Sequence, residues 1–238
     1  MKLSGAFGKL TRFELSLWIV SLAVTTVSFA VSALISGVFD VLTLIASLIG
    51  VTALIFVSKG HVLGQILTVV FAVFYGIISF FFRYYGEMIT YLCMTAPIAV
   101  AAVVSWARHP YAESNEVEVS RLTRGKAVFL AVSAVAVTSA FFFILQALGN
   151  ANLFFSTLSI TTSYCASYLT LFRSPWYAVA YSFNDIILII LWTLASLENI
   201  SYVPMIFCFL MFLANDAYGF VNWRRMKKRQ SGDASAEL

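Results

Sequence analysis

Charged residues are scarce in this chain. Lysine, arginine, aspartate and glutamate make up 11% of the 238 residues, whereas a typical soluble domain has about 25%. Hydrophobic residues make up 61% of the chain and aromatic residues 16%. So little charge cannot cover the surface of a water-soluble protein of this length. The composition therefore predicts an integral membrane protein surrounded by the lipid bilayer, and it argues against nucleic-acid binding.

Cysteine and histidine are scarce, and the common catalytic motifs are absent. Three cysteines (Cys93, Cys165 and Cys208) stand singly within apolar runs, so the sequence offers neither a disulfide framework nor a zinc site. It has no HExxH, no GxSxG, no paired-aspartate phosphotransferase motif and no Walker lysine. We therefore expect no enzyme, no metal or cofactor, and no direct use of ATP by this chain.

Apolar runs long enough to cross a bilayer, which takes about 20 residues, are abundant. Eight such runs are separated by short polar or turn-forming stretches. They span residues 13–36, 38–58, 61–82, 88–107, 127–148, 152–172, 175–197 and 202–223. The one long connection, 107–126, mixes both charges and is predicted to be a solvated loop. The predicted fold class is an all-α membrane protein with eight transmembrane helices.

The basic residues are distributed unevenly along these runs. If the N-terminus is cytoplasmic, every lysine and arginine except Arg83 falls on the cytoplasmic side, including Lys2, Lys9 and the RRMKKR stretch at 224–229. The pattern predicts a multi-pass protein of a bacterial inner (plasma) membrane with both termini in the cytoplasm. The first apolar run is longer than that of a signal peptide, so we expect a retained helix.

The last seven spans divide into two groups of three with a linking span between them. A shift of 116 residues places the second to fourth spans on the sixth to eighth, and Trp106 falls within one position of Trp223. Two three-helix groups joined directly would be inverted relative to each other in the membrane. One linking span between them gives both groups the same orientation, and parallel repeats of this kind are typical of transporters. The predicted segments are an N-terminus with an extra helix (1–37), a first repeat (38–107), a loop and linking helix (108–151), a second repeat (152–223) and a basic cytoplasmic tail (224–238).

The stretch YSFNDIILIILW, residues 181–192, has an amide and a carboxylate within an apolar run. Each is costly in a membrane unless it has a partner or a function. Tyr181, Asn184, Asp185 and Trp192 fall on one face at helical spacing. We predict that Asn184 hydrogen-bonds a ligand while the aromatic rings form a wall of the site. The alternative is that the polar groups only join neighbouring helices.

Two other spans carry polar residues at similar depth. The third span has Gln65, Thr68 and Tyr75, and the eighth has Asn215 and Asp216. We predict that these residues and the face of the seventh span line a passage for a small-molecule substrate. The serines of the sixth span, by contrast, are assigned to close helix packing rather than to ligand contact.

Several short stretches, taken in order, resemble the PnuC family of vitamin transporters. They are Tyr75 with YGE (85–87), Pro97 with Trp106, SPW (174–176), NDI (184–186) and GFVNWR (219–224). The resemblance covers about 38–226 and implies a 3+1+3 plan similar to that of full-length SWEET sugar transporters. It also implies facilitated diffusion of a nucleoside-like vitamin precursor, above all nicotinamide riboside, with trapping by a cytoplasmic kinase. A homo-oligomer is a further implication.

The sequence departs from the riboside-type pattern at two places. Ala99 and AVVSW (102–106) replace a glutamine and a Gly-Trp pair, and Tyr181 precedes Asp185 where the family has a WxxxN-type motif. Thiamine, riboflavin or a deoxynucleoside therefore stay open as substrates. Two other classes also stay open: a membrane enzyme acting on a lipid or isoprenoid with Asp185 and Asp216 as metal ligands, and a non-transporting scaffold.

Overall fold

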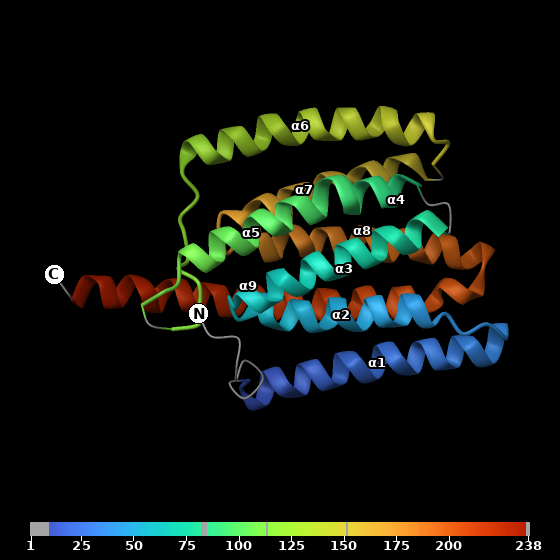
Figure 1. Ribbon diagram of the computed structural model, residues 1–238, viewed down its shortest axis with the longest axis horizontal. Coiled ribbons are helices and arrows are strands. Elements are labelled where there is room, and N and C mark those ends of the chain that lie inside the picture. Colours follow the sequence, from blue (N-terminus) through green and yellow to red (C-terminus); the bar gives the residue numbers. More distant parts are fainter. Residues whose placement is uncertain (1–9, 82–84, 113, 151, 237–238) are drawn as a thin grey trace.

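The computed structural model describes residues 10–81, 85–112, 114–150 and 152–236, in which long helices lie side by side (Figure 1). Lys2, Lys9 and Arg83 lie outside the described residues. The helices are α1 (Arg12–Ser36), α2 (Val41–Ser58), α3 (Val62–Phe81), α4 (Tyr85–Ile89), η2 (Thr90–Thr95), α5 (Ala96–Arg108), α6 (Arg124–Ala147), α7 (Leu153–Leu171), α8 (Tyr177–Glu198), η3 (Ile200–Tyr202) and α9 (Val203–Ala236). Apart from an isolated bridge between Pro110 and Val117, the described chain forms helices, turns and loops. The predicted all-helical class is confirmed.

Each predicted span coincides with a helix or, for the fourth span, with the consecutive helices α4, η2 and α5. Within the described residues, seven of these segments are long and apolar enough to cross a membrane. The remaining one, α7, has 19 residues, is richer in serine and threonine, and packs between α6 and α8. The largest difference from the prediction is at the C-terminal end, where α9 continues to Ala236 and so includes most of the predicted tail.

The fourth span changes its winding partway along. Residues Thr90–Thr95 form a π-helical turn, and the Ala96 N–H donates to the Tyr91 carbonyl five residues earlier. Pro97 follows this turn, and its ring cannot donate the hydrogen bond that a regular helix requires. Such wider turns are frequent at functional sites.

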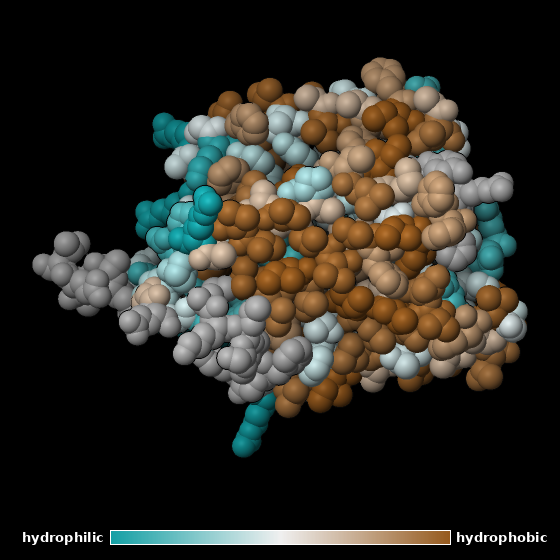
Figure 2. Space-filling view, in the orientation of Figure 1, coloured by the Kyte–Doolittle hydropathy of each residue, from teal (hydrophilic) through white to brown (hydrophobic). Residues whose placement is uncertain are grey.

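The outer faces of α1 and α6 are apolar and exposed. Leu34 on α1 is 86% exposed and Val135 on α6 is 68% exposed. Figure 2 shows apolar residues over most of the visible face, with hydrophilic residues gathered toward the two ends. A surface of this kind is costly in water and is suited to contact with lipid.

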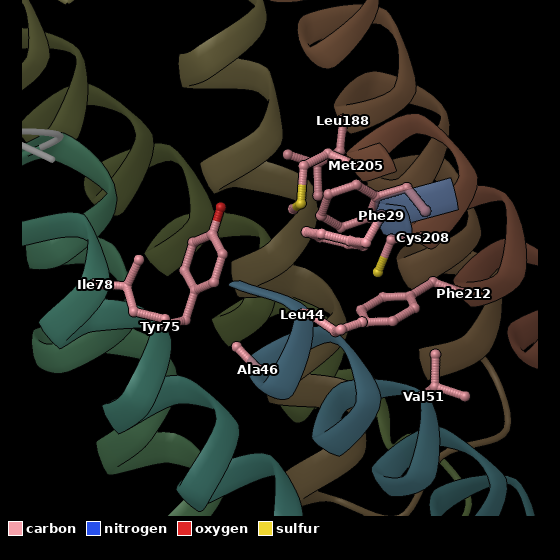
Figure 3. Packing of buried hydrophobic residues seen from close by; sticks show 11 residues of the cluster. Phe29, Leu44, Ala46, Val51, Tyr75, Ile78, Leu188, Met205, Cys208 and Phe212 are labelled. Carbon is pink, nitrogen blue, oxygen red and sulfur yellow. The ribbon is translucent and has the colours of Figure 1, made fainter. Parts of the chain in front are cut away.

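A hydrophobic cluster fills the centre of the bundle between α2, α3, α8 and α9. It includes Leu44, Val51, Cys208 and Phe212, all at most 9% exposed. Figure 3 shows Tyr75 at the edge of this cluster, with its hydroxyl directed away from the apolar side chains near its base. The tyrosine therefore contributes its ring to the core while its hydroxyl remains available to polar groups.

One end of the bundle carries most of the described basic residues, and we call it the basic end. It comprises the ends of α2, α5 and α7, the start of α8 and the C-terminal part of α9, with Lys59, Arg108, Arg173 and Arg224. Two tryptophans make equivalent hydrogen bonds at this end. Trp106 Nε1 donates to the Thr170 carbonyl at 2.9 Å, and Trp223 Nε1 donates to the Val57 carbonyl at 2.9 Å. The two rings lie 5.4 Å apart and are completely buried.

The residues that precede the two tryptophans repeat this arrangement. Ser105 Oγ donates to the Leu171 carbonyl at 3.0 Å, and Asn222 Nδ2 donates to the Ser58 carbonyl at 2.9 Å. The end of α5 thus contacts the end of α7 in the way that α9 contacts the end of α2. We use the name tryptophan latch for these four donors and their four carbonyl acceptors.

The ends of α2 and α7 are also alike. Gly60 and Arg173 both take a left-handed backbone conformation, with φ of 67° and 55°. In each turn this residue donates to a carbonyl three positions back, and the next residue donates to one five positions back. The turns are 113 residues apart (173 − 60) and the tryptophans 117 (223 − 106). The predicted offset of 116 lies between these values, and the pair of repeats stays a prediction.

The segment between α5 and α6 packs against the basic end instead of extending into solvent as a free loop. Val117 is completely buried, and its N–H donates to the Gly60 carbonyl at 2.9 Å. Ser120 N–H donates to the Arg173 carbonyl at 3.0 Å, and Gln230 Nε2 donates to the Val117 carbonyl at 3.1 Å. The composition predicted a solvated loop joining the two halves, and Val117 is the buried residue of its described part, the others being at least partly exposed. The segment also bridges the turns at Gly60 and Arg173.

Candidate functional site

The bundle encloses a cavity of about 370 Å³ that lies toward the end opposite the basic end. Its volume is within the range of sites for small ligands, about 300–1,000 Å³. Residues from α3, from the α4 and η2 part of the fourth span, and from α6 to α9 surround it. They are Tyr75, Gly86, Glu87, Thr90, Tyr91, Leu145, Leu148, Gly149, Asn150, Asn152, Ser156, Ser159, Ile160, Ser163, Asn184, Leu188, Leu191, Trp192, Ala195 and Phe209.

Asn184 lies at the inner part of this cavity, as the sequence predicted, and it is 6% exposed. Its Oδ1 accepts hydrogen bonds from Ser159 Oγ at 3.2 Å and from Thr162 Oγ1 at 3.0 Å. Among the described residues, its Nδ2 group has no hydrogen-bond partner. The amide is therefore compatible with both helix packing and ligand binding. Its oxygen joins α8 to α7, and its two N–H donors are available to a ligand.

The serines of α7 also contribute to the cavity. Ser156, Ser159 and Ser163 all lie on its wall, although the sequence analysis assigned this face to helix packing. Ser159 has both roles, since its hydroxyl donates to Asn184 and also borders the cavity. Spacing alone could not separate these roles, because a small polar residue serves helix packing and ligand contact equally well.

Aromatic side chains form another wall of the cavity. Tyr75, Tyr91, Trp192 and Phe209 all line it. The Tyr75 and Tyr91 rings are 4.7 Å apart at their centroids, and Trp192 lies 5.6 Å from the Tyr202 ring. Tyr75 and Trp192 were predicted from helical spacing, whereas Tyr91 and Phe209 were not. The faces and edges of these rings can pack against a planar ligand.

Glu87 brings a carboxyl group to the cavity, and the predicted set of site residues did not include it. The Tyr75 and Ser79 hydroxyls lie within hydrogen-bonding contact of this carboxyl group. Its Oε2 atom is buried and has no hydrogen-bond partner among the described residues. The sequence analysis used YGE (85–87) for the family resemblance and began the fourth span at residue 88, so Glu87 was expected to lie outside the apolar span.

Three of the other predicted residues lie between the cavity and the basic end. Tyr181 and Ser167 hydroxyls are 3.1 Å apart, and the Asp185 carboxyl meets that of Asp216 within hydrogen-bonding contact. Asp185 and Asp216 are 2% and 3% exposed, and Asp185 Oδ2 has no hydrogen-bond partner among the described residues. Two carboxylates in contact repel each other when both are ionised, so this pair is suited to hold a shared proton.

Three further predicted residues are engaged within the protein or buried. Asn215 Nδ2 donates to Ser21 Oγ at 3.0 Å and to the Met211 carbonyl at 2.7 Å. Thr68 Oγ1 donates to the Gly64 carbonyl at 2.9 Å, and Gln65 is 3% exposed. These side chains lie in the interior of the bundle and do not line the cavity. The sequence placed them on the correct helices, but it could not give their depth.

Within the described part of the chain, no cluster of three histidine, cysteine, aspartate or glutamate side chains could hold a metal ion. The cavity is instead bordered by a mixed polar and aromatic wall, and it lies between two similar halves that are latched at the far end. An all-helical bundle with such a cavity is the architecture of a membrane transporter.

The comparisons with known proteins agree with this class. A model of the family described as nicotinamide mononucleotide transporter matches residues 40–225, and the chain belongs to this family. The nicotinamide riboside transporter PnuC of Neisseria mucosa is 26% identical over 231 residues, covering 95% of this chain and 86% of that protein. The crystal structure of the vitamin B3 transporter PnuC matches with a TM-score of 0.77 at 24% identity, covering 94% of this chain and 95% of that one. These relatives are transporters and not enzymes, so the membrane-enzyme alternative is set aside.

Proposed function

We propose that the protein takes up nicotinamide riboside by facilitated diffusion through the cavity between its two halves. The observation that carries this proposal is the combination of groups on the cavity wall. Asn184 offers amide donors to a carboxamide or ribose oxygen, and Tyr91 and Trp192 offer ring surface to a planar base. The nicotinamide riboside transporter of Neisseria mucosa, which matches most of the chain, supports the same substrate.

The charge of the lining favours a riboside over a mononucleotide. The family is described by nicotinamide mononucleotide, which carries a phosphate. Glu87 lines the cavity, and no lysine, arginine or histidine does so among the described residues. A phosphate placed beside a carboxylate in this partly dry site would be repelled, with no cation to compensate. The riboside lacks that group, so we propose the riboside as the substrate.

We further propose that the basic end faces the cytoplasm of a bacterium and that the cavity lies toward the outside of its inner membrane. The excess of lysine and arginine at that end supports this orientation, which places both termini in the cytoplasm. In this arrangement the substrate enters from outside, and a cytoplasmic kinase traps it after release. The homo-oligomer implied by the family resemblance stays a prediction.

Thiamine is the second candidate because its thiazolium ring, like the pyridinium of the riboside, is a planar cation. The aromatic and acidic wall of the cavity suits either ring. The departures at Ala99, Tyr181 and Asp185 are compatible with a change of ligand within the same transporter class. Riboflavin and deoxynucleosides lack this charge and are weaker candidates.

The proposal is tested with the purified full-length chain in liposomes. We expect saturable uptake of labelled nicotinamide riboside that stops at equal concentrations inside and outside. Unlabelled thiamine, riboflavin, deoxynucleosides and nicotinamide mononucleotide serve as competitors. Uptake of one of these in preference to the riboside would replace the substrate, and no saturable uptake of any would overturn the proposed function.

A further inference from the structure

Glu87 is the acidic side chain among the described residues that line the main cavity. It lies in α4 at the start of the fourth span, just before the π-helical turn at Thr90–Thr95. It borders both the main cavity and a smaller one of about 60 Å³, together with Tyr75 and Trp192. Since Glu87 Oε2 is buried without a partner among the described residues, the carboxyl group is only partly satisfied. A buried acid of this kind is costly unless a ligand completes its environment.

The protein supplies no positive charge to this carboxyl group from the described lining. The described residues of both cavities include no lysine, arginine or histidine. The hydroxyls of Tyr75 and Ser79 can donate hydrogen bonds to Glu87 but carry no compensating charge. A cation that enters the cavity would therefore meet a carboxyl group that has no cationic partner in the described lining.

The rings around Glu87 strengthen the same preference. Tyr75, Tyr91, Trp192 and Phe209 line the cavity with Glu87, and the face of an aromatic ring attracts a cation through its quadrupole. A planar organic cation can gain from both contacts at once, whereas a neutral ring of the same shape gains only from packing. The carboxylate and the rings together form a site for a flat, positively charged group.

Building on the proposed function, we propose that Glu87 and the aromatic wall recognise the positive charge of the ligand's ring. Glu87 is the counter-charge that makes the site selective for planar organic cations over neutral analogues of the same shape. The carboxamide and ribose contacts then contribute affinity that does not depend on this charge. Glu87 is thus a specificity-determining residue of the cavity.

The test compares two forms of one ligand. Nicotinamide riboside has a cationic pyridinium ring, and 1,4-dihydronicotinamide riboside has the same sugar and carboxamide on a neutral ring. Dissociation constants of both are measured by calorimetry on the purified full-length protein, for the unmodified chain and for Glu87→Gln. We expect the unmodified chain to bind the cation about 10- to 100-fold more tightly, because a unit charge nearby in a partly dry site is worth that factor. In Glu87→Gln this ratio should fall to within about threefold of one, with the affinity for the neutral form little changed.

Two control variants test whether the change in the affinity ratio is due to Glu87. Glu198→Gln makes the same chemical change at an exposed position at the end of α8 and should leave the ratio unchanged. Arg83→Gln is measured as well, because Arg83 lies four positions before Glu87 in the sequence and outside the described residues. If Arg83→Gln removes the preference and Glu87→Gln does not, the assignment to Glu87 is wrong.

The remaining outcomes separate this inference from the proposed function. If the unmodified chain binds both forms with equal affinity, the inference is overturned and the proposed function stands. The same conclusion follows if Glu87→Gln weakens the binding of both forms by the same factor. If neither riboside binds, the proposed function fails, and the charge preference is measured with 1-methylnicotinamide against nicotinamide. Tighter binding of the methylated cation, lost in Glu87→Gln, would support the inference alone, and its absence would overturn it.

Discussion

Replacing Asn184 by leucine separates ligand binding from helix packing at the centre of the cavity. The Nδ2 donors have no partner among the described residues, and they are the groups that we expect a ligand oxygen to meet. Leucine has a similar volume but no donor, so the bound ligand would keep a buried acceptor without a partner. This costs about 1–3 kcal/mol, which weakens binding roughly 5- to 150-fold.

The cost to the fold should be smaller. Thr162 Oγ1 loses Asn184 Oδ1 but keeps the carbonyls of Leu158 and Ser159, each at 3.0 Å. Ser159 Oγ loses its acceptor Asn184 Oδ1, at 3.2 Å, but Ser159 borders a polar cavity that water can enter. We therefore expect a loss of stability of at most about 1 kcal/mol, since a single net hydrogen bond is worth about that much.

The assay uses calorimetry for the dissociation constant and thermal unfolding of the ligand-free protein for stability. Gln146→Leu is the matched control, because it removes an amide at an exposed position of α6 and should change neither quantity. Ser159→Ala should weaken binding by less than about threefold, since Thr162 still holds the Asn184 amide. Normal binding by Asn184→Leu with a lower unfolding temperature would refute the reasoning, because the amide would then serve helix packing alone.

Three further predictions concern topology, energetics and the repeat. Glu118→Cys, in a background without native thiols, should react with an impermeant reagent only from the cytoplasmic side, and labelling from outside would reverse the proposed orientation. A pH gradient across liposomes should leave the initial uptake rate nearly unchanged; gradient-driven accumulation that is lost in Asp185→Asn or Asp216→Asn would show proton coupling instead. Trp106→Phe and Trp223→Phe should each increase amide hydrogen exchange at the basic end to a similar extent, because each removes one equivalent hydrogen bond worth about 0.5–1.5 kcal/mol. Exchange that rises in only one variant would argue against equivalent halves.

The helices could be predicted closely because the bilayer imposes a simple rule on the sequence. A span needs about 20 apolar residues, and the breaks between spans contain turn-forming or charged residues. The first predicted span, 13–36, therefore matches α1 (Arg12–Ser36) within one residue. The rule gives no information on how far a polar helix continues beyond the membrane, so the extension of α9 to Ala236 was not foreseen.

The candidate site was predicted only in part, because helical spacing gives a face and not a depth. Asn184 and Trp192 line the cavity, but Asp185 is one position further round the helix and meets α9 instead. The same limit applies to Gln65, which lies on a helix of the cavity at a different level. Which polar residue reaches the cavity depends on how the helices are tilted and staggered, and this is a tertiary property.

Glu87 was missed for a local reason. A charged residue after Gly86 is the usual sign of a loop, and the apolar run begins only at the next position. The structure instead starts the helix before Glu87 and widens it at Thr90–Thr95. The signal that was available is Pro97, which cannot continue a regular hydrogen-bond ladder and so favours a distortion in the preceding turn.

The positions of the cavity and the tryptophan latch bear on how transport proceeds. The cavity lies toward one end of the bundle, and the latch joins the two halves at the other end through Trp106 and Trp223. Between them, Asp185 and Asp216 form a buried contact, and neither residue lines the cavity. We expect a ligand that leaves toward the basic end to require opening of the latch, because the latch joins the two halves there. Because the latch consists of two equivalent sets of hydrogen bonds, rotation of one half against the other would release both sets together, and this is the motion expected of parallel repeats.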